Sequence, residues 1–459
     1  MQTTLASRAR WLLALGSIGA ALSAHGANRS YPGSAAPCNT TLQACIDGAN
    51  SGDTIVLVAD QYIAEDVIIS KNLTLAPGQA QPSIRTVTAL ASTTDVQVTV
   101  TGLTSRGGYS RVRGFLAPGG GNLTLTVTAS QLRGTGFSSG LELITSNNQG
   151  AYGAIVGSFR RNTVIQNGSG SNCAPAVNAS ALNGRMAVTV DRNDVRFTGL
   201  GQCAAVQMFS SAGAQAMEAV IRGNQIQGGD TSAGILLRAI RGTLRGAVVN
   251  NLVVARSSEV GIEVSADGSN GAIDADVRSN TVAEAGVGAR VSARTDLGSA
   301  VSGLLANNLL ANHAQGAILV ENGLNMPNHH NLVFASGPLP PNGYQPHGPN
   351  TRTGNPSFMN RADGDYRLLA TSDAIDHGDN ALMAGLDTTD LNGQPRQVRV
   401  LDIGAYEFQG EAMPAEPGAG VNGIPTLGEW SLLSLAVALG GLGARARQAK
   451  KCAPQRPAV

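Results

Sequence analysis

The segment AVIRGNQI at residues 219–226 is the clearest indication of the fold, because variants of it follow as GAVVNNLV at 246–253 and ADVRSNTV at 275–282. Its asparagine belongs to a series along the chain with spacings of 31, 31, 27, 29, 28 and 23 residues. The members are Asn162, Asn193, Asn224, Asn251, Asn280, Asn308 and Asn331. A period of this length is typical of a repeat architecture rather than of separate globular domains.

The residues that flank these asparagines are matched as well. Small or apolar residues lie five and three positions before, except that Asn328 precedes Asn331, and an aliphatic residue lies two positions after. The step of two residues indicates a strand, and the change of parity at the asparagine indicates a turn. We expect the asparagine itself to take the left-handed conformation there. A second strand follows eight to ten residues later, as at Gly234–Leu237.

About 28 residues per turn, with short strands and an asparagine turn, predict an all-β chain folded as a right-handed parallel β-helix. Successive coils of such a helix stack about 4.8 Å apart. We therefore expect the asparagine amides to form hydrogen bonds from coil to coil. The alternative is an antiparallel β-sandwich in which the spacing arises by chance.

The composition fits a narrow, regular core. The chain has 459 residues, a net charge of +1, 42% hydrophobic residues and only 4% aromatic residues. A chain this apolar is not disordered, and its charge excludes a strongly basic nucleic-acid binder. Its core must be filled by Ala, Val, Ile and Leu. We expect no nucleic-acid partner.

The two ends of the chain are typical of targeting segments. Arg8 and Arg10 precede an apolar run at 11–22, and small residues follow, which predicts a secretory signal peptide over 1–27. The alternative is a buried core helix. At the other end, the apolar run 431–444 is too short for a full membrane span. The cations that follow it predict a cytoplasmic tail: Arg445, Arg447, Lys450 and Lys451.

The residues before this apolar run resemble the IPTL-CTERM sorting signal of Gram-negative bacteria. The matching motif is Ile424, Pro425, Thr426, Leu427, Gly428, Glu429 and Trp430. Ser431 departs from the glycine that usually follows the tryptophan. The resemblance implies an exported protein at the cell surface, in the outer membrane or outside the cell. It also implies an envelope processing enzyme as partner and transient membrane contact through the C-terminal segment. An ordinary tail anchor is the alternative.

Two further stretches resemble parts of exported β-helix proteins. Residues 41–77 are similar to the opening of pectate-lyase-like β-helix proteins, which implies a short amphipathic helix that caps the first coil. Residues 355–409 resemble the choice-of-anchor Q module, with blocks such as Asp390–Arg396 and Asp402–Glu407. We expect this segment to close the β-helix at its C-terminal end. The predicted organisation is a signal peptide (1–27), a capped β-helix (28–336), a Pro-rich loop (337–354), the choice-of-anchor Q-like segment (355–410), a tether (411–423) and the sorting signal with its apolar segment and basic tail (424–459).

Four cysteines lie in the exported part of the chain. Cys173 and Cys203 are 30 residues apart, close to the local period, so they should face each other on neighbouring coils. Cys38 and Cys45 lie together near the predicted cap. Because the compartment is oxidising, both pairs are predicted to form disulfides.

The sequence gives weaker evidence for a catalytic site than for the fold. Hydrolases need two carboxylates at a defined separation, and lyases typically need a carboxylate cluster for Ca²⁺ and a base. The acids next to the asparagine turns do not recur from coil to coil, because Asp191 and Asp194 have arginine, threonine, glutamine or apolar counterparts. The best remnant of an enzyme site is His329–His330 with Asn331. The alternative is that the two histidines are exposed loop residues.

Two binding features remain. Arginines on the asparagine turns, such as Arg160, Arg192 and Arg222, predict either a stripe for anionic polysaccharide or lipopolysaccharide, or a solvated face. One loop carries three oxygen donors that predict either a Ca²⁺ site or a capped turn. They are Asp387, Asp390 and Asn392. We expect no other cofactor. The favoured function is a non-catalytic surface or matrix protein with a rigid face for glycan binding or adhesion, and the alternative is a polysaccharide lyase or another carbohydrate-active enzyme.

Overall fold

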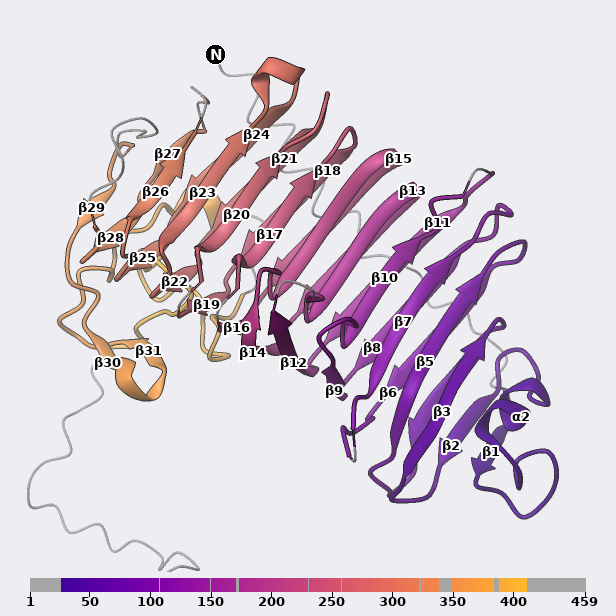
Figure 1. The fold of residues 1–459 in the computed structure, drawn as a ribbon. Coiled ribbons are helices and arrows are strands. Elements are labelled where there is room, and N and C mark those ends of the chain that lie inside the picture. Colours follow the sequence, from indigo (N-terminus) through magenta and orange to yellow (C-terminus); the bar gives the residue numbers. More distant parts are fainter. Residues whose placement is uncertain are drawn as a thin grey trace, which may run out of the picture. The chain divides into compact units, whose positions relative to one another are not determined.

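The structure is a computed structural model. It describes residues 26–410 except 107, 149, 171–172, 230, 257, 322–323, 325, 338–347 and 384–387. The predicted signal peptide up to residue 25, most of the Pro-rich loop, the tether and the sorting signal therefore lie outside the described residues. The described part is a parallel β-helix of about ten coils, with three faces formed by ladders of parallel strands (Figure 1).

The first face begins at the N-terminal cap and extends to the last coil. Its strands are β1 (Asn28–Tyr31), β2 (Thr54–Leu57), β4 (Leu73–Pro77), β6 (Val96–Thr101), β8 (Leu123–Thr128), β11 (Ala154–Arg160), β13 (Val177–Asp191), β15 (Val206–Arg222), β18 (Thr243–Val249), β21 (Ala272–Arg278), β24 (Ala300–Ala306) and β27 (Asn328–His329).

The second face shares β13 and β15 with the first face, because each of these long strands bends around the corner between the two ladders. The first part of β13 pairs with β10, and its last part pairs with β11. The other strands of the second face are β3 (Tyr62–Ile69), β5 (Ser83–Ala91), β7 (Arg111–Leu116), β10 (Leu141–Thr145), β17 (Ala233–Ala239), β20 (Val260–Ala266), β23 (Val287–Ala293) and β26 (Gly316–Val320).

The third face is a separate nine-stranded sheet. Its strands are β9 (Gln131–Gly134), β12 (Thr163–Gly170), β14 (Asp194–Gly201), β16 (Gln225–Gly228), β19 (Leu252–Ala255), β22 (Thr281–Ala283), β25 (Leu309–Ala311), β28 (Leu332–Phe334) and β29 (Arg352–Thr353). In the described residues, this face begins only at β9, so the earlier coils pass from the first face to the second without a third strand. This explains why the asparagine period is absent from residues 78–150.

The predicted asparagine ladder lies at the corner between the first and third faces. Each side-chain amide donates to the Oδ1 atom of the asparagine in the next coil, at 2.9–3.1 Å from Asn162 to Asn331. Each of the seven amides also donates to a backbone carbonyl of the preceding coil, as Asn193 does to Phe159 at 3.0 Å. The seven side chains are buried. The ladder thus satisfies polar groups that would otherwise be costly to bury.

The turn differs from the expected one in a single respect. The left-handed residue is not the ladder asparagine but the residue directly before it. The residues with positive φ are Arg161, Arg192, Gly223, Asn250, Ser279, Asn307 and His330, with φ between 52° and 63°. The prediction that the ladder asparagine itself takes this conformation is therefore wrong. The asparagine is needed for its amide and not for its tolerance of positive φ.

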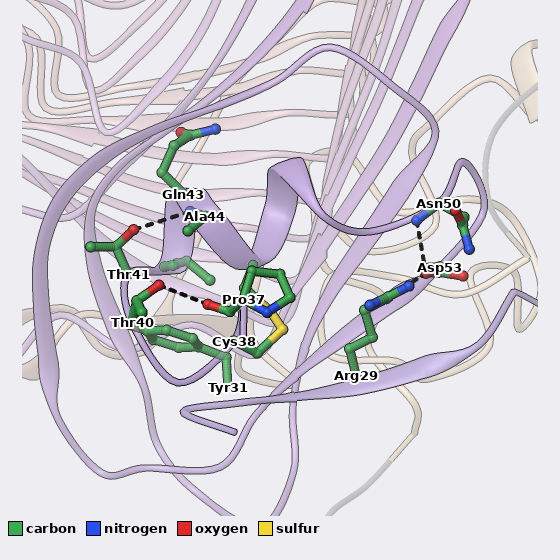
Figure 2. The surroundings of a disulfide bond; sticks show 12 residues. Arg29, Tyr31, Pro37, Cys38, Thr40, Thr41, Gln43, Ala44, Asn50 and Asp53 are labelled. Carbon is green, nitrogen blue, oxygen red and sulfur yellow. Dashed lines mark hydrogen bonds and ion pairs between the residues drawn. A yellow bond between two sulfur atoms is a disulfide. The ribbon is translucent and has the colours of Figure 1, made fainter. Parts of the chain in front are cut away.

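The N-terminal end is capped as the sequence predicts. The helix α2 (Leu42–Asp47) begins at Thr41, whose side chain accepts a hydrogen bond from the Ala44 amide at 3.1 Å. Leu42, Cys45 and Ile46 are buried against the first coil. Figure 2 shows the disulfide that joins Cys38 to Cys45 beside this helix. The helix therefore covers strand edges that would otherwise be exposed.

The C-terminal segment 355–410 lies along the β-helix rather than across its end. It contains β30 (Phe358–Asn360) and β31 (Asp365–Leu368), which form an antiparallel pair, and the 3₁₀ turns Arg361–Asp363 and Asn380–Met383. A further 3₁₀ turn, Thr295–Leu297, lies within the coils.

This segment covers the outer surface of the third face. Two clusters of apolar side chains join it to that surface, one around Tyr366 and Tyr406 against β19 and the other around Ile403 against β25 and β28. Figure 1 shows the segment, from orange at β30 and β31 to yellow at its end, beside the strands of the third face. We expected it to close the end of the β-helix, but its apolar side chains instead bury one side of the stack.

Candidate functional site

The second face carries a row of polar side chains that point outward from successive coils. Arg113, Glu142, Asn178 and Gln207 occupy one register on β7, β10, β13 and β15. Their neighbours along each strand are buried, which indicates that these four side chains point away from the core, and Asn178 is itself buried within the row. Because adjacent coils repeat about every 4.8 Å, the row presents polar groups at regular intervals.

The members of this row hold one another in place. The Arg113 guanidinium lies 3.3 Å from the Glu142 carboxylate. The Asn178 amide donates to Glu142 at 3.5 Å and accepts from Gln207 at 3.4 Å. Ser180 donates to the same Asn178 oxygen at 3.1 Å. A connected network of this kind fixes side-chain positions before any ligand arrives.

An apolar row runs next to the polar row. Phe115, Ile144 and Phe209 project outward from the same strands, and all three are half-buried. Ser180 and Arg238 complete the register on β13 and β17. We call the two rows together the second-face ribbon: Arg113, Glu142, Asn178 and Gln207 with Phe115, Ile144 and Phe209. It combines hydrogen-bonding groups with two aromatic rings.

The ribbon continues into a charged cluster on the later coils. Arg238 pairs with Asp267 at 2.6 Å, and Arg290 pairs with Glu321 at 2.8 Å. Glu263 lies between these pairs, at the same register as Arg290. Burial raises the pKa of Glu263, and the nearby Arg290 opposes that rise. A carboxyl with a perturbed pKa on an outer surface is a candidate for acid–base chemistry.

The predicted arginine stripe on the asparagine turns is largely paired with acids. Asp191 is almost fully buried, and it lies 2.8 Å from Arg160 and 3.4 Å from Arg222 on the two adjacent coils. Arg278 lies 2.6 Å from Asp276 and is itself buried. The Arg192 guanidinium donates to the Thr389 hydroxyl at 3.4 Å. Much of the positive charge of the stripe is therefore paired with neighbouring acids, and Arg192 contacts the C-terminal segment.

The first face has a shallow groove with charged groups at one register. Glu218, Arg245, Asp274 and Ser302 follow one another on β15, β18, β21 and β24. The Ser302 hydroxyl donates to Asp274 at 3.2 Å. Two acids therefore do recur on this face, with an arginine between them, at a register away from the asparagine turn.

The predicted calcium ligands are placed as follows. Asp387 lies outside the described residues, and Asn392 is exposed. Asp390 is buried, and its Oδ1 accepts the backbone N–H groups of Asn392 at 2.9 Å and Gln394 at 2.8 Å. Its Oδ2 accepts the Glu407 N–H at 3.0 Å. Asp390 thus caps the turn, and the calcium site stays a prediction.

The C-terminal segment also contains a fully buried arginine. Arg396 donates to the backbone carbonyls of Gly404 and Asp402 and lies 3.8 Å from Glu407. Burial raises the pKa of Asp402 to about 6 and that of Glu407 to about 7. The Asp390–Arg396 and Asp402–Glu407 blocks did not reveal this group, because a sequence does not show which of their charges are buried together.

The histidines noted in the sequence meet an acid from the C-terminal segment. The Nδ1 atoms of His329 and His330 are 2.8 Å apart, and the Asp379 carboxylate lies 4.0 Å from His329. Burial lowers the pKa of His329, and the neighbouring His330 lowers it further. Both predicted disulfides are confirmed: Cys173 joins Cys203, and Cys38 joins Cys45.

Comparison with known proteins supports the targeting prediction. Residues 422–449 match the IPTL-CTERM motif, which confirms the sorting signal and indicates an exported protein of the cell envelope. The residues of that motif and of the basic tail lie outside the described part of the chain. Within the described part, no helix is long and apolar enough to cross a membrane.

The other comparisons concern sequence and fold. Curated protein sequences provide no match. Among solved structures, the chain is similar to "Crystal structure of pectate lyase Pel9A", with 14% identity and a TM-score of 0.38, over 82% of this chain and 93% of that chain. This likeness concerns the β-helix architecture and carries no argument about activity. The resemblance of residues 355–409 to the choice-of-anchor Q module stays a prediction.

Proposed function

We propose that the protein is an exported surface or matrix protein whose second-face ribbon binds an extended glycan without cleaving it. The observation that supports this most is the pairing of a polar row with an apolar row over the same successive coils. Sugar rings have hydroxyl edges and apolar faces, so a glycan that lies along the stack can contact both rows. The coil spacing is comparable to the length of one sugar unit in an extended chain.

The charge of the ribbon favours an uncharged or weakly charged glycan. Arg113 is paired with Glu142, and the arginines further along, Arg238 and Arg290, are paired with Asp267 and Glu321. Ion pairs of this kind leave little net positive potential for an anionic chain. Anionic polysaccharide or lipopolysaccharide, predicted from the arginine stripe, remains the second ligand class to be tested.

A binding screen with matched variants tests the proposal. The exported protein is applied to a glycan array that holds neutral and anionic polysaccharides. Gln207→Ala combined with Phe209→Ala should reduce binding at least tenfold, because both rows lose a contact. Gln227→Ala is the control, since this exposed glutamine lies on the third face. Equal binding by the ribbon variant and the wild type would contradict the proposal.

The alternative function is a carbohydrate-active enzyme, and Glu263 is the observation that favours it. Its pKa is raised by burial, and arginines flank it on the adjacent coils. A lyase needs a base near a charge-stabilising group, and an arginine beside a carboxylate resembles that requirement. If the enzyme hypothesis is right, Glu263→Gln should abolish turnover while leaving glycan binding in place.

A further inference from the structure

Four segments that are distant in sequence meet where the last coil ends. The strand β27 and its turn supply His329 and His330, and the preceding coil supplies Asn307. The loop at Asn350 and the C-terminal segment at Asp379 complete the group. The histidines and Asp379 are half-buried, so they are accessible to a small solute.

Three of these residues offer metal-ligand atoms close together. The two imidazole Nδ1 atoms are 2.8 Å apart, and the Asp379 carboxylate is 4.0 Å from His329. One ligand atom from each residue lies within 4.8 Å of the others. Bonds of about 2.0–2.2 Å from nitrogen and oxygen to a tetrahedral Zn²⁺ place neighbouring ligand atoms somewhat more than 3 Å apart. Small side-chain rotations are therefore sufficient to form such a site.

The surroundings hold these groups in place. The Asp379 N–H donates to the Asn307 side-chain oxygen at 2.8 Å, and the Asn307 amide donates to the Asp379 carbonyl at 3.2 Å. The Asn350 amide lies 2.9 Å from Nε2 of His330. Polar partners of this kind orient metal ligands in proteins.

Metal binding requires a change of the His330 tautomer. With Asn350 donating to Nε2, neutral His330 carries its proton on Nδ1 and directs it at His329. Metal binding needs a lone pair on both Nδ1 atoms, so the His330 proton moves to Nε2. The Asn350 amide then turns so that its oxygen accepts that proton, since the oxygen and nitrogen positions of an amide are assigned from its hydrogen bonds.

We propose that His329, His330 and Asp379 bind one divalent transition-metal ion, with water in the remaining position. Two imidazole nitrogens and one carboxylate oxygen suit Zn²⁺, Co²⁺, Ni²⁺ or Cu²⁺, whereas Ca²⁺ and Mg²⁺ take oxygen ligands. The ion joins the last coil to the C-terminal segment, because Asp379 belongs to that segment. The site is independent of the second-face ribbon and of any glycan binding.

Calorimetric titration of the exported protein with Zn²⁺ tests the site, with a purification tag that contains no histidine. We expect one saturable site per chain, unaffected by excess Ca²⁺. Co²⁺ bound there should show the visible absorption of a four-coordinate ion. Loss of outer-shell partners already weakens metal binding about 10–100-fold. His330→Gln and Asp379→Asn remove ligands and should therefore weaken Zn²⁺ binding by about 100-fold or more.

His377→Gln is the matched control, because this histidine lies in the C-terminal segment and contacts the Ile375 carbonyl instead. It should leave Zn²⁺ binding unchanged. Zn²⁺ should also raise the melting temperature of the wild type and of His377→Gln, but not that of the ligand variants. Lack of saturable uptake by the folded wild type, or equal uptake by His329→Gln/His330→Gln, would overturn the proposal.

Discussion

The side-chain amide of Asn224 donates to the Oδ1 atom of Asn251 at 2.9 Å, across the boundary between two coils. The same amide donates to the Val190 carbonyl at 2.9 Å, and its oxygen accepts both the backbone and side-chain N–H groups of Asn193. One buried side chain therefore satisfies polar groups on the coils before and after it. The ladder stabilises the stack because each asparagine provides hydrogen-bond partners for buried polar groups of the neighbouring coils.

Replacing Asn224 with leucine should destabilise the protein by about 3–5 kcal/mol, because several buried partners lose their hydrogen bonds at once. Asn39→Leu is the control, since Asn39 is exposed, and it should change stability by less than about 0.5 kcal/mol. Chemical unfolding followed by circular dichroism measures both. Equal stability of the two variants would show that the ladder contributes little.

The Cys173–Cys203 disulfide should stabilise the β-helix, because it closes a loop of 30 residues between adjacent coils. Loop-closure entropy predicts a loss of about 3–4 kcal/mol for Cys173→Ala/Cys203→Ala. The Cys38–Cys45 bridge closes a shorter loop and should contribute about 2 kcal/mol. Non-reducing peptide mapping checks the pairing, and denaturant unfolding checks the order of the two effects. A larger loss from the shorter loop would contradict this account.

The C-terminal segment should lose stability as the pH rises. Burial raises the pKa of Glu407 to about 7, above its unfolded value of 4.5, and that of Asp402 to about 6, above 3.8. The folded state then binds more protons than the unfolded state between about pH 4 and 7. The free energy of unfolding therefore falls as the pH rises across that window.

Melting temperatures between pH 4 and 8 measure this effect, and Glu407→Gln should flatten the slope. An increase of stability with pH through this window would show that Glu407 and Asp402 are stabilised as carboxylates beside Arg396.

The sorting signal predicts a processed C-terminus. If the envelope enzyme cleaves near the motif, mature protein from the native host lacks the apolar run, the basic tail and Cys452. Intact-mass measurement of the exported protein decides this. A mature species that still ends at Val459 would favour an ordinary tail anchor.

The sequence predicted the parts of the fold that repeat at a fixed register. The asparagine turns recur with matched flanks, so the ladder and the Cys173–Cys203 bridge followed from counting residues. The positive φ of the residue before each ladder asparagine could not be predicted in this way, because Arg161, Gly223 and Ser279 share no side-chain property.

The covered surface of the third face had a sequence signal that was not used. The strand β19, Leu252–Ala255, is a run of four apolar residues, and all four are buried. Continuous apolar runs are typical of strands buried on both faces. The second-face ribbon could not be found in this way, because its register is separated from the asparagine turn by loops of variable length.

We propose above all that the second-face ribbon binds an extended glycan and does not cleave it. Extended neutral and anionic polysaccharides are incubated with the exported protein in the presence of Ca²⁺, and bound glycan is measured together with new reducing ends and ultraviolet absorbance. A lyase product absorbs in the ultraviolet because its new C=C bond is conjugated to a carboxylate. We predict retained binding that falls in the Gln207→Ala/Phe209→Ala variant, with no product above the blank. Reproducible turnover that disappears in Glu263→Gln would contradict the account and show that the protein is an enzyme.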